Sequence, residues 1–306
     1  MTTLVFGHKS PDTDATMSAI VWAWYLTNRR NTPAEPRLLG EPNTEAAFVL
    51  KHWGFQKPAI IADVAPGQDV MIVDTNNPAE LPPSINDANI KAIIDHHMLV
   101  GGLKTRSPIT IVMRPLACTA TVMHDIMGPD VAGLPSEIKG AMLSCILSDT
   151  LEFRSPTTTP TDKSVAEKLA ADLGVSIPEL AAKMFEAKSD VSAFSDAELL
   201  RMDSKEYTVA GKELRVSVLE TTSPKVVLDR KSSLMRSMDA VAKEDGADQV
   251  LLFVVDILKE EATLLVPNDL VRRLAEASFG AKVTGDTVVL PGIMSRKKQI
   301  IPALKL

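Results

Sequence analysis

Cysteine is scarce in this 306-residue chain, which contains only Cys118 and Cys145, each in apolar surroundings. Because neither belongs to a CxxC pair, the sequence argues against a disulfide framework and against a structural zinc site. We expect two buried, reduced thiols and a protein of the reducing cytoplasm.

Aromatic residues and long apolar runs are also few. Phe, Trp and Tyr make up 4% of the chain and the net charge is −6. Few rings are therefore available to stack on bases, and no excess of positive charge attracts a phosphate backbone, so we expect no nucleic-acid partner. The N-terminus lacks a signal-peptide pattern, and the most apolar stretch, LLFVVDIL, is short and contains Asp256. We expect no membrane partner.

The first half of the chain alternates strands with helices. Short apolar runs predict buried strands at 3–7, 70–74 and 91–95. Apolar residues at helical spacing after residue 14 predict a helix that Thr13 or Asp14 could cap, and further helices are expected at 136–148 and twice within 162–187. This alternation predicts an α/β fold with a mostly parallel sheet and helices on both faces.

The pattern changes after residues 189–194, which are small and polar. We predict a linker there, so that the domains are 1–188 and 195–306. The second domain is expected to be a smaller α/β domain. We predict two helices in it, near 229–244 and 268–278, and a final loop, SRKKQ, and we find no internal repeat. The predicted strands lie at 207–211, 213–220, 249–258, 261–267 and 287–292.

Histidines and aspartates follow the predicted strands of the first domain. His8, Asp74 and the run Asp95, His96, His97 lie just beyond strand ends, where ligands bind in parallel sheets. The loop GHKSPDTDA adds Asp12 and Asp14, and LSDT adds Asp149. Each of these aspartates alone could merely cap a helix or a turn.

Together these side chains predict a metal site. So many neighbouring carboxylates would repel one another unless cations neutralised them, and two divalent metals would do so. Oxygen-rich ligation with a few imidazoles suits manganese or cobalt better than zinc, while magnesium usually keeps more water. Two metals ~3.5–4 Å apart can share a bridging hydroxide and clamp an in-line phosphoryl displacement. His52 and His124 lack such partners and are expected to be structural or surface residues.

A basic loop follows the last predicted strand. It contains Ser295, Arg296, Lys297 and Lys298. Such a run is usually a solvated surface, but arginine can also act as a bidentate fork for phosphate and lysine as a point charge. Lys205 is a further candidate for the second interpretation.

The order of GHKSPDTDA, VDTNN, DHH, LSDT and SRKKQ resembles that of the family II inorganic pyrophosphatases in the DHH phosphoesterase superfamily. DHH alone marks the superfamily, whereas its combination with SRKKQ is specific to the pyrophosphatases. The resemblance covers nearly the whole chain. It implies a manganese-dependent enzyme that hydrolyses pyrophosphate to two orthophosphates with a bridging hydroxide as nucleophile. Two Mn²⁺ are expected, with Co²⁺ or Mg²⁺ as substitutes and an additional Mg²⁺ arriving with the substrate.

The resemblance also implies roles for individual residues. His8 and Asp12 match ligands of one metal, and Asp14 and His96 match ligands of the other. Asp74 and Asp149 match carboxylates that reach both ions, and Asp95 would support them. His97 matches a residue that contacts the substrate and can protonate the leaving group. The positions expected to bind phosphate are Lys205, Ser295, Arg296 and Lys297. The residues expected to be catalytic are His97, Asp149, Arg296 and Lys297.

At the level of domains, the resemblance implies a DHH-type catalytic domain, a smaller substrate-binding domain and an active site in the cleft between them. It further implies a homodimer built through the N-terminal domain. The chain has no room for the regulatory nucleotide-binding insertion of some relatives.

Two alternatives stay open. One is another phosphohydrolase of the superfamily, such as an exopolyphosphatase or a nuclease of short oligonucleotides, although the GGGH element typical of the nucleases is missing. The other is a non-catalytic protein that binds metal and phosphate, because a fold alone does not give a function.

Overall fold

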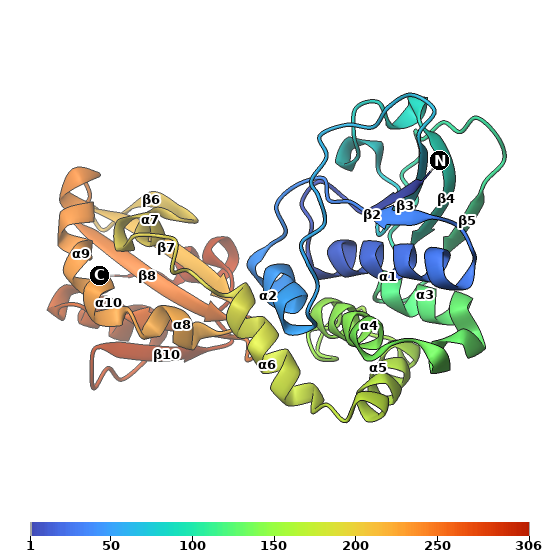
Figure 1. Ribbon diagram of the computed structural model, residues 1–306. Coiled ribbons are helices and arrows are strands. Elements are labelled where there is room, and N and C mark those ends of the chain that lie inside the picture. Colours follow the sequence, from blue (N-terminus) through green and yellow to red (C-terminus); the bar gives the residue numbers. More distant parts are fainter. Residues whose placement is uncertain (1, 306) are drawn as a thin grey trace. The chain divides into compact units, whose positions relative to one another are not determined.

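The computed structural model describes residues 2–305, which form two compact units. The first unit ends at Lys188 and the second begins at Ser189. In Figure 1 the first unit runs from blue to yellow-green and the second from yellow to red.

A five-stranded sheet forms the centre of the N-terminal unit. Every pair of neighbouring strands in it is parallel, which confirms the predicted mostly parallel sheet of an α/β fold. The predicted strands at 3–7, 70–74 and 91–95 are β1, β3 and β4. In order across the sheet the strands are β2 (Ala34–Pro36), β1 (Thr3–Phe6), β3 (Asp69–Val73), β4 (Asn89–Asp95) and β5 (Thr110–Met113).

Helices cover one face of this sheet. Helix α1 (Thr13–Arg29) packs on β1, β2 and β3, and α3 (Thr119–Met127) packs on β4; Figure 1 shows both on the same side. On the opposite face, Phe6 and Ile72 pack against Leu81 and Ile85. These two belong to a segment that contains the short 3₁₀ helices η1 (Pro78–Glu80) and η2 (Ile85–Asp87).

The start of α1 differs from the prediction. Asp12, not Thr13 or Asp14, caps the helix, because its Oδ1 accepts a hydrogen bond of 3.0 Å from the backbone N–H of Ala15. The helix therefore begins at Thr13, and Asp14 lies in its first turn. There the Asp14 side chain is buried and is free to face the protein interior instead of the helix end.

The remaining helices of this unit form a second layer below α1. Helix α4 packs against α1, α3, α5 and α6, and α2 packs against α6 and α1. A capping box of Thr159 and Asp162 begins α5, and Gly174 ends it in a left-handed conformation. The bounds are α2 (Thr44–His52), η3 (Gly128–Gly133), α4 (Ser136–Asp149), α5 (Pro160–Leu173) and α6 (Ile177–Lys188).

The C-terminal unit contains a five-stranded mixed sheet. Strands β7 and β8 are parallel, and the other neighbouring pairs are antiparallel. The central strand β8 is buried along its whole length, as its continuous apolar sequence predicts. In order the strands are β10 (Thr287–Pro291), β9 (Glu261–Leu265), β8 (Gln249–Asp256), β7 (Lys212–Thr221) and β6 (Ser204–Val209).

Two apolar clusters cover the two faces of this second sheet. One contains Leu274 of α10 (Asp269–Phe279), and the other contains Leu234 and Met238 of α9 (Lys231–Glu244). The predicted loop SRKKQ is instead a short π-helix, Arg296–Ile300. Ser295 caps it by accepting from the N–H of Lys298, and Ile300 is buried in the first cluster. The other helices are α7 (Asp196–Arg201), α8 (Pro224–Leu228) and α11 (Ile301–Ala303).

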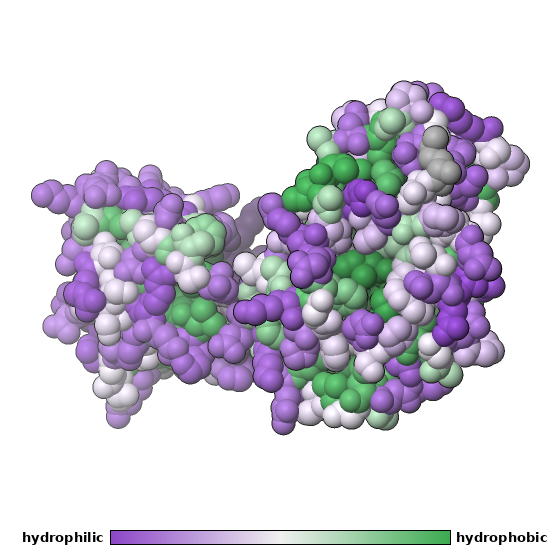
Figure 2. Space-filling model, in the orientation of Figure 1, coloured by the Kyte–Doolittle hydropathy of each residue, from purple (hydrophilic) through white to green (hydrophobic). Residues whose placement is uncertain are grey.

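Hydrophilic residues cover most of the visible face of each unit, and the apolar patches between them are small (Figure 2). Among residues 2–305, no helix combines the length and apolar character needed to cross a membrane. Cys118 and Cys145 are buried free thiols, as predicted. Burial raises the pKa of both, so they stay protonated at neutral pH.

Candidate metal centre

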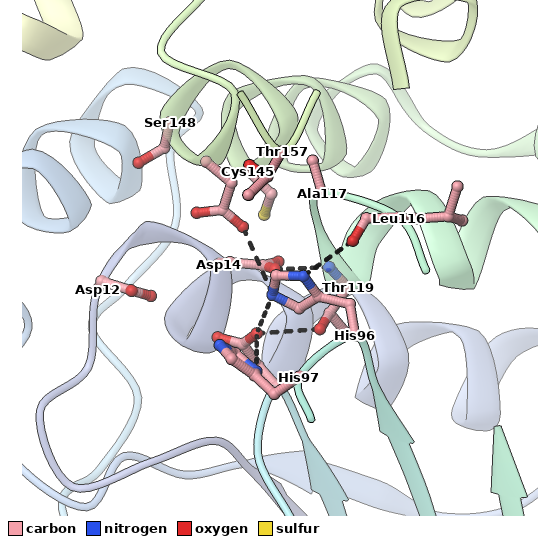
Figure 3. A network of polar contacts seen from close by, with 12 residues as sticks. Asp12, Asp14, His96, His97, Leu116, Ala117, Thr119, Cys145, Ser148 and Thr157 are labelled. Atoms are coloured by element: carbon pink, nitrogen blue, oxygen red, sulfur yellow. Dashed lines mark hydrogen bonds and ion pairs between the residues drawn. The ribbon is translucent and has the colours of Figure 1, made fainter. Parts of the chain in front are cut away.

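Six side chains named from the sequence converge at the carboxyl end of the parallel sheet. His8, Asp74 and His96 follow β1, β3 and β4, while Asp12 and Asp14 begin α1 and Asp149 ends α4. Figure 3 shows Asp14, His96 and His97 directed towards one another. These side chains form three sets, and within each set the ligand atoms lie within 4.8 Å of one another. The sets are His8, Asp12 and Asp74; Asp14, His96 and Asp149; and Asp74, His96 and His97.

Asp74 belongs to both the first and the third of these sets. His8 Nε2 is 3.5 Å from Asp74 Oδ2 and 3.7 Å from Asp12 Oδ2. On the other side, His96 Nε2 is 3.3 Å from Asp74 Oδ1 and 4.0 Å from Asp149 Oδ2. Asp74 therefore presents one carboxylate oxygen to each histidine, as a carboxylate shared by two sites would have to do.

The backbone and a neighbouring hydroxyl hold these carboxylates in place. Asp74 has a φ of 59°, a left-handed conformation that Asp tolerates better than most residues and that turns the chain sharply after β3. Thr119 donates its hydroxyl to Asp74 Oδ1 at 3.0 Å and its backbone N–H to Asp14 Oδ2 at 2.6 Å. The first residue of α3 thus orients two of the candidate ligands.

The charges of this cluster are unbalanced. Burial first, and then the negative charges of Asp14 and Asp74, raise the pKa of Asp149 well above its usual value. Burial and the charge of Asp74 raise the pKa of Asp14 to about 6. Burial would lower the pKa of His8, but hydrogen bonds and charge from Asp12 and Asp74 outweigh it and raise that pKa to about 10. The carboxylates therefore draw positive charge into the site.

The chemistry of the donors fits divalent cations. Asp149 Oδ2 is buried and has no hydrogen-bond partner among the described residues, a costly arrangement unless a cation binds there. Four carboxylates and two imidazoles form an oxygen-rich set with some nitrogen, which suits manganese. His96 Nδ1 lies 3.1 Å from the carbonyl oxygen of Leu116, which leaves Nε2 to face Asp74 and Asp149.

His97 occupies a different position from His96. Its Nδ1 lies 2.8 Å from Asp95 Oδ1, and that oxygen also accepts from the backbone N–H groups of His96 and His97. Asn76 donates to the other oxygen of Asp95 at 2.6 Å. The hydrogen bond to Asp95 is the largest of the effects that raise the pKa of His97. Asp95 therefore fixes the imidazole ring of His97.

A cavity of about 200 Å³ opens onto the cluster. It is large enough for a small anion. Its walls are Asp12, Asp74, His96, His97, Ala117, Asp149 and Thr157.

The predicted phosphate-binding residues line one pocket in the C-terminal unit. This pocket has a volume of about 690 Å³ and includes Lys205, Ser295, Arg296 and Lys297. Asp203 accepts a hydrogen bond of 2.7 Å from Arg296 Nη2, and its carbonyl oxygen accepts from Nη1. Arg296 is thereby held against the pocket wall, whereas Lys298 does not line the pocket.

Several residues of the site carry no signal in the sequence. Thr119, Asn76 and Thr157 at the metal cluster, and Asp203 in the pocket of the C-terminal unit, are ordinary polar residues that only the folded chain brings to these places. Asn76 lies in the run TNN directly after Asp74, so its position next to a candidate ligand was the one available hint. The two remaining histidines lie away from the cluster: His52 contacts the rings of Phe48 and Trp53, and His124 is half-buried in α3.

Comparison with known families divides the chain in two. Residues 2–148 match the DHH family, N-terminal domain, and residues 182–306 match the DHHA2 domain.

Individual relatives match over almost the whole chain. The probable manganese-dependent inorganic pyrophosphatase of Deinococcus radiodurans is 40% identical over 308 residues, which cover 98% of this chain and 97% of that protein. The protein of the same name from Lactobacillus helveticus is 35% identical over 302 residues, with 98% and 96% covered. Among solved structures, the putative family II inorganic pyrophosphatase of Methanococcus jannaschii is 35% identical, covers 98% of this chain and 97% of its own, and has a TM-score of 0.61.

Proposed function

Since the chain belongs to the family of manganese-dependent inorganic pyrophosphatases, we propose that it hydrolyses pyrophosphate to two orthophosphates at a pair of divalent cations. The resemblance expected from the motifs is confirmed by these relatives. One observation of this chain's own supports the two-metal site: six acidic and imidazole side chains from separate segments cluster together, and four of them, Asp12, Asp74, His96 and Asp149, line one small cavity.

The cations would be held in two neighbouring positions. His8 and Asp12 would bind one ion, Asp14 and His96 the other, and Asp74 and Asp149 would contribute to both. When bound, two manganese ions would neutralise the substrate's charge and supply a water molecule acidic enough to attack phosphorus at neutral pH. Co²⁺ or Mg²⁺ would substitute for manganese, and a further Mg²⁺ would enter with the substrate.

The protein's other residues would bind and protonate the substrate. Asp95 orients His97 through Nδ1, so Nε2 of His97 would carry the proton that the departing phosphate takes up. Arg296, Lys297 and Lys205 would bind phosphate oxygens and stabilise the charge that develops on the leaving group. Ser295 would bind phosphate with them in the same pocket.

Substrate preference tests this proposal directly. The turnover of the manganese-loaded protein would be measured on pyrophosphate, on triphosphate and on a short oligonucleotide. We expect pyrophosphate to be strongly preferred, because the relatives that match nearly the whole chain are named inorganic pyrophosphatases. A preference for triphosphate would identify a polyphosphatase, and binding of pyrophosphate without turnover would identify a metal and phosphate sensor. Either result would refute the proposal.

We further propose that the protein is a homodimer through its N-terminal unit and acts in the cytoplasm. Strand β5 is an edge of the parallel sheet, and Ile111 on it is 53% exposed. An open strand edge with an exposed apolar side chain favours pairing with a second copy of the chain. Two buried reduced thiols agree with a reducing compartment.

A further inference from the structure

A buried glutamate outside the candidate ligand set connects the segments that carry it. Glu45 lies in the first turn of α2 and is fully buried. Its Oε2 accepts a hydrogen bond of 2.9 Å from the hydroxyl of Thr13 and another of 2.6 Å from the hydroxyl of Ser148. One oxygen atom thus ties the beginning of α1 to the end of α4.

Both hydroxyl groups belong to direct neighbours of candidate ligands. Thr13 lies between Asp12 and Asp14, and Ser148 precedes Asp149; Ser148 appears beside the cluster in Figure 3. Asp14 and Asp149 belong to one set of ligand atoms, and Asp12 belongs to another. The spacing between the Thr13 and Ser148 hydroxyls therefore sets where three carboxylates lie relative to one another.

The packing of these helices does not by itself call for a carboxylate. Lys188 Nζ lies 3.5 Å from Glu45 Oε2 and balances its charge, yet an apolar side chain of similar volume often replaces such a buried ion pair without loss of stability. What an apolar residue could not provide is a single acceptor for two converging hydroxyl groups. Such an acceptor satisfies both buried hydroxyl groups and at the same time fixes their positions relative to each other.

We propose that Glu45 is a positioning residue for the metal ligands. It fixes the distance between the Asp12–Asp14 segment and Asp149 by accepting from Thr13 and Ser148 at one point. The inference rests on the proposed function for its use in catalysis, but metal binding alone tests it.

The test compares two substitutions of Glu45 in the full-length chain. The affinity of the metal-free protein for Mn²⁺ would be measured by calorimetric titration without substrate. We expect Glu45→Ala to weaken Mn²⁺ binding about tenfold, as is typical when a residue that supports metal ligands is removed. Glu45→Gln should restore most of the affinity, because one amide oxygen can still accept from both hydroxyl groups. Glu41→Gln is the matched control: Glu41 is exposed, pairs with Lys57 and precedes the same helix.

Ser148→Ala provides a milder variant in case Glu45→Ala does not fold. It removes one of the two donors and should weaken Mn²⁺ binding in the same direction. Where Glu45→Ala folds, adding Ser148→Ala to it should weaken Mn²⁺ binding by less than the sum of the two single effects, because both changes remove one shared contact. If Glu45→Ala or Ser148→Ala lowers only the thermal stability and leaves Mn²⁺ affinity unchanged, Glu45 is a packing residue and the inference is overturned. A wild-type protein that binds no Mn²⁺ would overturn it too, whereas failure to hydrolyse pyrophosphate would refute only the proposed function.

Discussion

Asp95 Oδ1 lies 2.8 Å from Nδ1 of His97. Asp95 is fully buried and its second oxygen accepts from Asn76, so the carboxylate cannot follow the ring if the ring turns. The imidazole is half-exposed and lines the cavity at the metal cluster. A buried carboxylate that fixes one ring nitrogen leaves the other available as the proton donor that we propose for the reaction.

A substitution of His97 tests whether this residue donates a proton or binds a metal. We expect His97→Gln to lower kcat about a hundredfold or more, which is the usual size of a general-acid contribution. Its Mn²⁺ affinity should stay close to that of the wild type, because Asp74, His96 and the other candidate ligands remain. Steady-state kinetics and metal titration of the same preparation measure both effects. His52→Gln is the control, since His52 lies outside the cavity. A large loss of Mn²⁺ affinity would show that His97 is itself a ligand.

Asp149→Asn should have opposite effects on stability in the two metal states. Because the pKa of Asp149 is raised in the folded protein, by burial and by Asp14 and Asp74, its ionisation destabilises the metal-free fold, and it does so more as the pH rises. The substitution removes this repulsion. At pH 8 we expect the midpoint of thermal unfolding to rise by a few degrees in the metal-free variant and to fall in the presence of Mn²⁺.

Calorimetric scans with and without a chelator measure both values. The same change at exposed Asp125 should leave both midpoints near those of the wild type. If the metal-free variant unfolds at a lower temperature than the metal-free wild type, Asp149 is not repelled by its neighbours. If the variant and the wild type have the same midpoint with Mn²⁺, Asp149 is not a ligand.

Arg296 and Lys298 lie in one short helix but only Arg296 lines the pocket. We expect Arg296→Ala to raise the KM for pyrophosphate about tenfold or more, because hydrogen bonds to a charged group are lost. Arg296→Lys should recover part of the loss, since lysine keeps the charge but not the fork. Lys298→Ala should change KM little. Equal effects of Arg296→Ala and Lys298→Ala would show that the segment is only a solvated, charged surface.

A charge on the free edge of the N-terminal sheet tests the proposed dimer. Ile111→Lys should shift the protein towards the monomer in analytical ultracentrifugation, because a buried lysine at an interface would be costly. Val289→Lys is the matched control: Val289 is comparably exposed and lies on β10, at an edge of the other sheet. A dimer that tolerates Ile111→Lys, or a monomeric wild type, would contradict the assignment of this interface.

Strand periodicity predicted much of the fold because the strands are buried. Apolar runs such as KAIID and QVLLFVVDIL are stable when both faces of the strand are buried, and they form β4 and β8. The candidate ligands could be named for a related reason. Parallel strands end at one edge, so His8, Asp74 and His96 had to approach one another once the sheet formed.

Other features depend on tertiary contacts that no local pattern records. Asp12, Thr13 and Asp14 can all cap a helix. In the folded chain Asp12 accepts from the backbone N–H of Ala15, while Asp14 accepts from that of Thr119, a residue 105 positions away. The segment SRKKQ is predicted as a loop after the last strand, but it forms a helical turn in which Ile300 is buried. Glu45 carried no signal either, because its two donors are adjacent to it only in the folded chain.

Anomalous diffraction from crystals of the manganese-loaded protein tests the central claim most directly. We expect two strong manganese peaks in the N-terminal unit, one contacted by His8 and Asp12 and the other by Asp14 and His96, with Asp74 and Asp149 reaching both. A single peak among these residues, or manganese bound elsewhere in the chain, would contradict the two-metal site.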